Sequence, residues 1–115
     1  MNQNDSIEKA FYWLKKAADN DHTEAQYLLG NLYKQEVSNG SVLNYKQMAY
    51  WWNKAAEKEH ANAQFFLGQL YKDGRGVPQD LNEALKWHMK AAENGNASSL
   101  DITNELQKRK ENTKE

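Results

Sequence analysis

The chain has 115 residues, enough for one small domain with a modest core. It carries 15 Lys and Arg against 16 Asp and Glu, a formal net charge of −1, which argues against an electrostatic nucleic-acid binder. It contains no cysteine, so disulfides and thiolate metal sites are excluded, and this fits a reducing compartment.

The predicted elements are six helices, because the composition is poor in proline and rich in Ala, Leu, Lys, Glu and Gln. In chain order they are expected at 6–20, 22–35, 45–58, 60–73, 80–94 and 97–110, with longer connections at 36–44 and 74–79 and a frayed tail at 111–115. Ser6 is the expected N-cap of the first helix. Three later helix starts have capping-box spacing: Asp21 with Glu24, Asn44 with Gln47, and Asp80 with Glu83.

The start of the chain does not resemble a targeting segment. The first six residues are polar and no apolar run of signal-peptide type follows them. No stretch approaches the roughly 18 apolar residues that a membrane helix needs. We therefore expect a cytoplasmic protein that binds neither membrane nor nucleic acid; a chain from which a signal peptide had been removed would have the same features. The basic cluster at 108–110 is interpreted as a solvated helix end.

Two sequence blocks repeat along the chain. Residues 13–18 recur at 51–56 and 87–92, with spacings of 38 and 36 residues. Residues 25–33 match residues 63–71, again 38 apart. In the second block one apolar stripe has helical spacing: Ala63, Phe66, Leu67, Leu70 and Tyr71. Such blocks predict tandem helical hairpins that form a core only by stacking.

Small and aromatic residues in the blocks suggest how the hairpins pack. Gly30 and Gly68 fall in mid-helix, where glycine costs about 1 kcal/mol against alanine. We expect a neighbouring helix to approach them too closely for a Cβ. The paired alanines at 17–18, 55–56 and 91–92 should do the same on the partner helix. Aromatic residues are predicted to fill the space between adjacent hairpins: Trp13, Tyr33, Trp51, Tyr71 and Trp87.

The pattern resembles the Sel-1-like repeat (SLR) family of the tetratricopeptide-like superfamily, over residues 7 to about 100. The second repeat carries the whole family motif: Ala63, Leu67, Gly68, Tyr71, Gly74, Gly76, Val77, Asp80, Ala84, Trp87, Lys90, Ala91 and Ala92. The first carries Ala25, Leu29, Gly30, Tyr33, Trp51, Lys54, Ala55 and Ala56, but its loop around Gly40 is two residues longer and Met48 replaces an alanine.

This resemblance implies an all-α solenoid with a right-handed superhelix. We expect a single repeat domain over 1–115, with a leading helix at 6–20, repeat 1 at 22–58, repeat 2 at 60–94 and a closing helix at 97–110. The closing helix is polar, as a solenoid end should be. The leading helix has an apolar patch at 11–14, which indicates a fragment of a longer array, partial exposure, or docking of a partner. The protein is thus expected to be a monomer or a homodimer through this helix.

The sequence offers little chemistry. His22, His60 and His88 lack metal-ligand spacing, and the first two are interpreted as structural residues at helix starts. Gly74-Arg75-Gly76 follows a helix, so it is interpreted as a turn and not a phosphate loop. A branch of the family associated with hydrolysis of cell-wall-related compounds relies on paired cysteines, which this chain lacks. We expect no enzyme, metal or cofactor.

In the superfamily, the first helix of each hairpin lines a concave groove, and the resemblance implies partner-binding residues there: Glu24, Tyr27, Asn31, Lys34, Gln35, Asn62, Phe65, Gln69, Lys72 and Asp73. Tyr27 and Phe65 are either anchors for a peptide or packing residues, and Lys34 and Lys72 either bind a carboxylate or are solvated. The predicted function is an adaptor or scaffold that binds a protein partner. The alternatives are an immunity protein that neutralises a bacterial effector and, more remotely, a cell-wall or β-lactam hydrolase.

Overall fold

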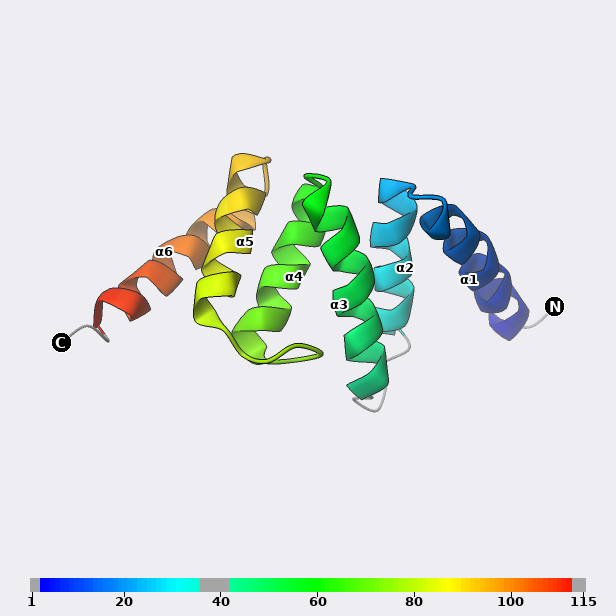
Figure 1. The fold of residues 1–115 in the computed structure, drawn as a ribbon, viewed down its shortest axis with the longest axis horizontal. Coiled ribbons are helices and arrows are strands. Elements are labelled where there is room, and N and C mark those ends of the chain that lie inside the picture. Colours follow the sequence, from blue (N-terminus) through cyan, green and yellow to red (C-terminus); the bar gives the residue numbers. More distant parts are fainter. Residues whose placement is uncertain (1–2, 36–41, 113–115) are drawn as a thin grey trace.

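The computed structural model describes residues 3–35 and 42–112, which form six α-helices. These are α1 (Gln3–Asp19), α2 (Thr23–Gln35), α3 (Val42–Glu57), α4 (Ala61–Asp73), α5 (Leu81–Glu93) and α6 (Ala97–Asn112). Each helix packs on the next along the chain in a molecule of 58 × 29 × 20 Å. Figure 1 shows this order from one end of the long axis to the other. The predicted architecture of stacked helical hairpins is confirmed.

The helix starts differ from the prediction at three places. Helix α1 begins at Gln3, so Ser6 lies inside the helix and is not its N-cap. Helix α3 begins at Val42, so Asn44 also lies inside its helix. Asp21 has a left-handed φ of 70°, and the next residue, His22, caps α2 instead: its Nδ1 accepts the Ala25 N–H at 3.2 Å. The predicted connection at 36–41 lies outside the described residues, and α6 extends to Asn112, two residues into the predicted tail.

Both helices of the second hairpin begin with a side-chain cap. His60 Nδ1 accepts the Ala63 N–H at 3.1 Å, as His22 does one repeat earlier. Because Nδ1 is an acceptor, the ring proton lies on Nε2, which is 2.8 Å from the Glu24 carboxylate. The predicted cap at Asp80 is confirmed, since its Oδ1 accepts the N–H groups of Asn82 and Glu83 at 3.0 and 3.1 Å.

The helices of each hairpin meet where a ring lies on a glycine. A Cβ on Gly30 would overlap the indole of Trp52, and a Cβ on Gly68 would lie 2.7 Å from Nε2 of His88. The predicted close approach at these glycines is confirmed, although the sequence did not identify the two rings. Trp52 also donates its indole N–H to the Tyr27 carbonyl at 3.2 Å, which fixes the ring across the hairpin.

A polar seam joins the ends of α1, α2 and α3. The buried side chain of Gln26 donates to the Ala18 carbonyl at 3.2 Å and accepts from Lys58 Nζ, also at 3.2 Å. Lys58 also contacts the Asp21 carboxylate, and this contact lowers the pKa of Asp21. Gln26 thus satisfies its own buried polar groups while it ties three helices together.

The same seam recurs one repeat later. Gln64 donates to the Ala56 carbonyl at 3.0 Å, and Asn94 donates to Gln64 Oε1 at 3.0 Å and to the Glu59 carboxylate at 2.9 Å. These amide donors lower the pKa of Glu59. Asn94 therefore takes the place of Lys58 in the second seam. The two seams make equivalent contacts, but the residue that reaches the Gln and the acid is charged in the first and neutral in the second.

The apolar patch at the start of the chain is divided between core and surface. Phe11 and Leu14 pack against a buried cluster of Ala18, Ala25, Leu29 and Trp51. Tyr12 and Trp13 are exposed. The prediction that tryptophans fill the space between hairpins holds for Trp51 and Trp87, which are buried, but is wrong for Trp13. Within the described ranges no helix combines the length and apolar character needed to cross a bilayer.

His88 is the one fully buried histidine in the described ranges. Its Nδ1 lies 3.2 Å from Ser99 Oγ, and its Nε2 has no hydrogen-bond partner among the described residues. Burial, helped by the positive charge of Lys72, lowers the pKa of His88 to about 4. The imidazole is therefore neutral in the folded protein at neutral pH.

The ring-on-glycine contact predicts a stability penalty for Gly30→Ala. Changing an exposed glycine in a helix to alanine raises the free energy of unfolding by about 1 kcal/mol. Here the added methyl overlaps Trp52, and overpacking costs about 1–3 kcal/mol, so we expect a net loss. Urea unfolding should show a lower unfolding free energy for Gly30→Ala, and a smaller loss in a Trp52→Phe background. A more stable Gly30→Ala protein would contradict the contact.

His88 predicts a loss of stability in mild acid. The unfolded chain binds a proton at His88 near the ordinary pKa of 6.5, whereas the folded protein does so only near 4. The contribution is complete above pH 6.5 and is lost as the pH falls toward 4. Between pH 7 and pH 5 we expect the unfolding free energy to fall by about 2 kcal/mol. Asp21 and Glu59 titrate below this window, because their pKa values are lowered.

The variant that tests this is His88→Trp. It replaces the histidine that packs on Gly68 with the residue type that packs on Gly30 in the first hairpin. Its unfolding free energy should depend much less on pH between 7 and 5, as measured by urea unfolding at both values. An equal pH dependence in wild type and variant would show that another group is responsible.

Candidate functional site

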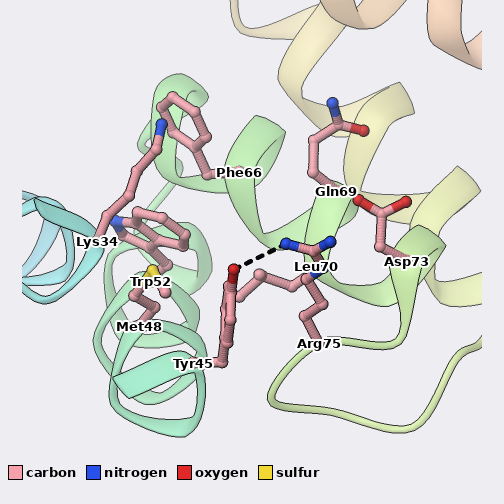
Figure 2. Close-up of a pocket in the computed structure, with 9 residues that line it drawn as sticks. All are labelled: Lys34, Tyr45, Met48, Trp52, Phe66, Gln69, Leu70, Asp73 and Arg75. Atoms are coloured by element: carbon pink, nitrogen blue, oxygen red, sulfur yellow. Dashed lines mark hydrogen bonds between the residues drawn. The ribbon is translucent and has the colours of Figure 1, made fainter. Parts of the chain in front are cut away.

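Two adjoining pockets lie along helices α2 and α4. One, of about 390 Å³, is lined by Tyr27, Asn31, Lys34, Gln35 and Phe66. The other, of about 380 Å³, is lined by Lys34, Tyr45, Met48, Trp52, Phe66, Gln69, Leu70, Asp73 and Arg75. Lys34 and Phe66 belong to both, so we treat the two pockets as one surface, the α2–α4 groove. Figure 2 shows the second pocket with its lining side chains.

Stacked aromatic rings form the floor of the groove. The Phe66 ring stacks on Trp52 with centroids 5.1 Å apart and an interplanar angle of 23°. Trp52 is itself held by its packing on Gly30 and its bond to the Tyr27 carbonyl. Lys34 Nζ lies 4.4 Å from the centroid of Phe66, close enough for a cation–π contact. The floor is thus an apolar surface with a cation at its edge (Figure 2).

Tyr45 and Arg75 form one wall. An Arg75 guanidinium N–H donates to the Tyr45 hydroxyl at 2.7 Å, and the guanidinium lies 5.3 Å from the ring centroid. Arg75 is placed there by a tight turn, since Gly74 and Gly76 have φ values of 70° and 75° that only glycine adopts easily. A Cβ on Gly76 would also overlap the Tyr45 carbonyl, so the turn packs directly on α3.

The remaining polar groups of the second pocket lie on α4. The Gln69 side-chain oxygen is buried and has no hydrogen-bond partner among the described residues. Asp73 adds a carboxylate one helical turn further along (Figure 2). Within the described ranges, Lys34, Asp73 and Arg75 form no ion pair. The groove therefore offers two cations, one anion and the three amides of Asn31, Gln35 and Gln69 above an apolar floor.

Six of the ten predicted binding residues line the groove: Tyr27, Asn31, Lys34, Gln35, Gln69 and Asp73. The other four, Glu24, Asn62, Phe65 and Lys72, lie outside both pockets. Two of these four make contacts between repeats: Glu24 pairs with His60, and Asn62 accepts from Asn96 at 3.3 Å.

The two predicted aromatic anchors pack on neighbouring rings. Tyr27 stacks on His60 with centroids 4.4 Å apart, and it lines the groove as well. Phe65 meets Phe66 and His88 edge-on, at 5.1 and 5.4 Å, outside both pockets. Tyr27 thus packs on a neighbouring ring and also lines the groove, and its role as a peptide anchor stays a prediction, whereas the contacts of Phe65 are packing contacts.

Sequence reasoning missed six lining residues: Tyr45, Met48, Trp52, Phe66, Leu70 and Arg75. Phe66 and Leu70 belong to the apolar stripe that predicted the core, and Arg75 belongs to the predicted turn. The repeat gave no signal for Arg75 as a lining residue, because the turn that follows α4 packs on Tyr45 of α3. No group of three or more His, Asp or Glu side chains in the described part of the chain is arranged to hold a metal ion.

Comparison with known proteins gives a consistent result. A family model described as Sel1 repeat matches residues 3–22, 23–60 and 61–96. The chain resembles the crystal structure of a protective antigen of uropathogenic Escherichia coli strains that displays an SLR fold, with 33% identity and a TM-score of 0.76. It also resembles a Sel1 repeat protein from Oxalobacter formigenes, with 33% identity and a TM-score of 0.72.

These matches cover most of the present chain but only part of each relative. The match covers 91% of this chain and 21% of the E. coli protein, and 81% of this chain and 37% of the Oxalobacter protein. The chain thus spans well under half the length of either solved structure. A search of curated proteins gives no significant match.

Proposed function

The chain belongs to the Sel1 repeat family, whose repeats generally mediate protein interactions, and we propose that it is an adaptor or scaffold that binds a partner peptide in the α2–α4 groove. The observation that carries this proposal is the combination of an aromatic floor with cationic side chains in this groove. A stacked Trp52–Phe66 floor lies beside Lys34 and Arg75, neither of which has an ion-pair partner among the described residues. Aromatic floors with polar rims are typical of peptide-binding surfaces.

The floor is preorganised, which favours binding. Trp52 is fixed on one side by Gly30 and the Tyr27 carbonyl, and on the other by Phe66. A ligand side chain that covers Phe66 therefore displaces water from apolar surface without having to order the floor first. The cost of ordering falls instead on the Lys34 side chain, which is exposed.

The polar groups would set the orientation of the bound segment. Lys34 and Arg75 can each donate to a carbonyl or a carboxylate of the segment. The two pockets meet at Lys34 and Phe66, so an extended or helical segment can cross both of them. An apolar anchor side chain over Phe66 with polar neighbours on either side is the expected motif.

We further propose that the protein acts by binding and not by catalysis. The resemblance to the hydrolytic branch of the family fails at the paired cysteines on which that branch relies. The charged groups of the groove, Lys34, Asp73 and Arg75, are better suited to holding a peptide than to activating a nucleophile, because they are spread along the apolar floor from α2 to α4 and the turn that follows α4.

The proposal predicts that a groove variant loses peptide binding while its fold is kept. Peptides selected from a random 12-residue phage library should bind Lys34→Ala/Arg75→Ala at least about tenfold more weakly than wild type, as measured by fluorescence anisotropy. The matched control is Lys15→Ala/Lys90→Ala, which removes the same charge from α1 and α5. Circular dichroism of both variants checks the fold. Equal weakening in both would mean non-specific charge binding, and unchanged affinity in the groove variant would exclude this groove.

A further inference from the structure

Helix α3 carries a row of three side chains that the hairpin core does not use. The row consists of Lys46, Tyr50 and Lys54, and we call it the α3 row. Residues four apart lie on one face of a helix, and eight residues rise about 12 Å along its axis. Tyr50 is 54% exposed, although α3 packs on α2 on one side and on α4 on the other. Its exposure is therefore a property of the middle of the stack.

A pocket of about 400 Å³ lies beside this row, between α3 and α1. Its lining residues are Lys15, Asp19, Lys46, Gln47, Tyr50 and Trp51. Trp51 is almost fully buried, so its ring lies at the bottom of the pocket, whereas Tyr50 stands at the edge. Lys15 pairs with Asp19 at 3.1 Å, so these two side chains add no net charge. The net positive charge of the lining comes from Lys46.

The two lysines of the α3 row flank an aromatic ring. Lys54 Nζ lies 5.2 Å from the ring centroid of Tyr50. Neither Lys46 nor Lys54 forms an ion pair with another residue in the described ranges. The charge of Lys54 helps to lower the pKa of Asp21, but that carboxylate is held by Lys58. The row thus presents a cation, an exposed ring and a second cation along about 12 Å of helix.

The equivalent rows of α1 and α5 show that the fold does not require this combination. The row on α1 is acid, aromatic and cation, and the row on α5 is amide, cation and cation: Glu8, Tyr12 and Lys16, then Asn82, Lys86 and Lys90. All three helices form and stack with these different residues. Of the three rows, that of α3 alone has a cation on each side of an aromatic ring.

The α3 row matches an extended acidic peptide. In an extended segment, alternate residues point to the same side, and four residues span about 13 Å. A segment with an acid, an aromatic residue two positions later and an acid two positions after that can place its ring against Tyr50. Its two carboxylates then reach Lys46 and Lys54. Because one exposed ion pair contributes little, recognition needs the ring contact and both pairs together.

The acids around the row favour a peptide over a nucleic acid or an anionic membrane. Duplex DNA carries about one charge per 1.7 Å of its axis, so its phosphates would meet every charged group along the surface. Asp19 lines the same pocket as Lys46, and Glu57 follows Lys54 by three residues, on the same side of α3. A peptide with two separated acids can place neutral residues opposite these carboxylates.

We propose that the α3 row and the pocket beside it form a second peptide-binding surface, which binds an extended segment with acidic, aromatic and acidic residues at alternate positions. The lining of this pocket shares no residue with the α2–α4 groove. The protein can therefore hold one segment in the groove and another on α3, and binding on α3 does not depend on binding in the groove.

The test compares two short peptides that differ only in register. The probe has the core Asp-Ser-Phe-Ser-Asp between neutral Gly and Ser residues, and the control has Ser-Asp-Phe-Asp-Ser in the same frame. The acids of the control lie about 7 Å apart and point away from the side of its ring. Amide shifts of ¹⁵N-labelled protein give both affinities, at 0.15 M salt to screen charges beyond about 8 Å. The probe should bind at least about fivefold more tightly, with the largest shifts in residues 46–54.

Tyr50→Ala should weaken binding of the probe at least about fivefold, because it removes the ring contact. Tyr12→Ala is the matched control, since Tyr12 is 59% exposed and also has a lysine four residues later, with Lys16 Nζ 5.9 Å from its ring. It should leave the affinity unchanged. Circular dichroism checks the fold, and Tyr50→Lys, which introduces the residue of the α5 row, replaces Tyr50→Ala if that variant does not fold.

Lys46→Glu introduces the residue of the α1 row and should weaken the probe at least about tenfold, since it turns an attraction into a repulsion. Its control is Lys86→Glu, which makes the same charge change on α5 and should have no effect. Lys34→Ala/Arg75→Ala in the α2–α4 groove should also leave this affinity unchanged. A fall in affinity with that groove variant would assign the probe to the groove and overturn the proposal.

Three further results would overturn the proposal. The first is equal affinity for the two peptides, which would mean attraction by charge alone. The second is equal weakening by Tyr12→Ala and Tyr50→Ala. The third is binding of phosphatidylserine vesicles or oligothymidylate that Lys46→Glu abolishes, in a protein that does not bind the probe.

Discussion

The contact between an aromatic ring and a mid-helix glycine holds each hairpin together, and much of the molecule depends on it. Gly30 allows the Trp52 indole to lie against the backbone of α2, and Gly68 allows His88 to lie against α4. Any larger residue would separate the helices and open the cluster around them. In the first hairpin the same indole then bonds to the Tyr27 carbonyl and stacks on Phe66. One side chain therefore closes the hairpin and forms the floor of the groove.

The fold could be predicted because the same sequence pattern occurs more than once along the chain. Two blocks with shared offsets predicted the helices and the close approach at the glycines, although not the rings that pack on them. The helix starts were harder to predict. Asp21 is a residue type that often caps helices, but its backbone is left-handed and the next residue, His22, is the cap. His60 caps its helix in the same way one repeat later. Gln26 and Gln64 were unremarkable in the sequence, since only the folded backbone shows that they are buried and fully bonded.

The groove was predicted only in part, for a physical reason. Positions carried over from the superfamily lie on the first helix of each hairpin, and six of them do line the groove, Lys34 and Gln69 among them. The wall comes from elsewhere: Tyr45 from α3, and Arg75 from a turn that folds back on it. Such contacts depend on how one hairpin meets the next. The rings of Tyr27 and Phe65 turn toward His60 and His88, because capping and buried histidines provide surfaces that the sequence did not reveal.

Nuclear Overhauser effects in the free protein test most directly whether the Trp52 ring lies on Gly30. We expect strong cross-peaks between the Gly30 Hα protons and the Trp52 indole Hδ1 and Hε1, with at least one Gly30 Hα shifted upfield by the ring. We expect matching cross-peaks between Gly68 and the His88 ring. A Trp52 indole with cross-peaks to solvent-exposed side chains, and none to Gly30, would contradict the account of both the hairpin and the groove floor.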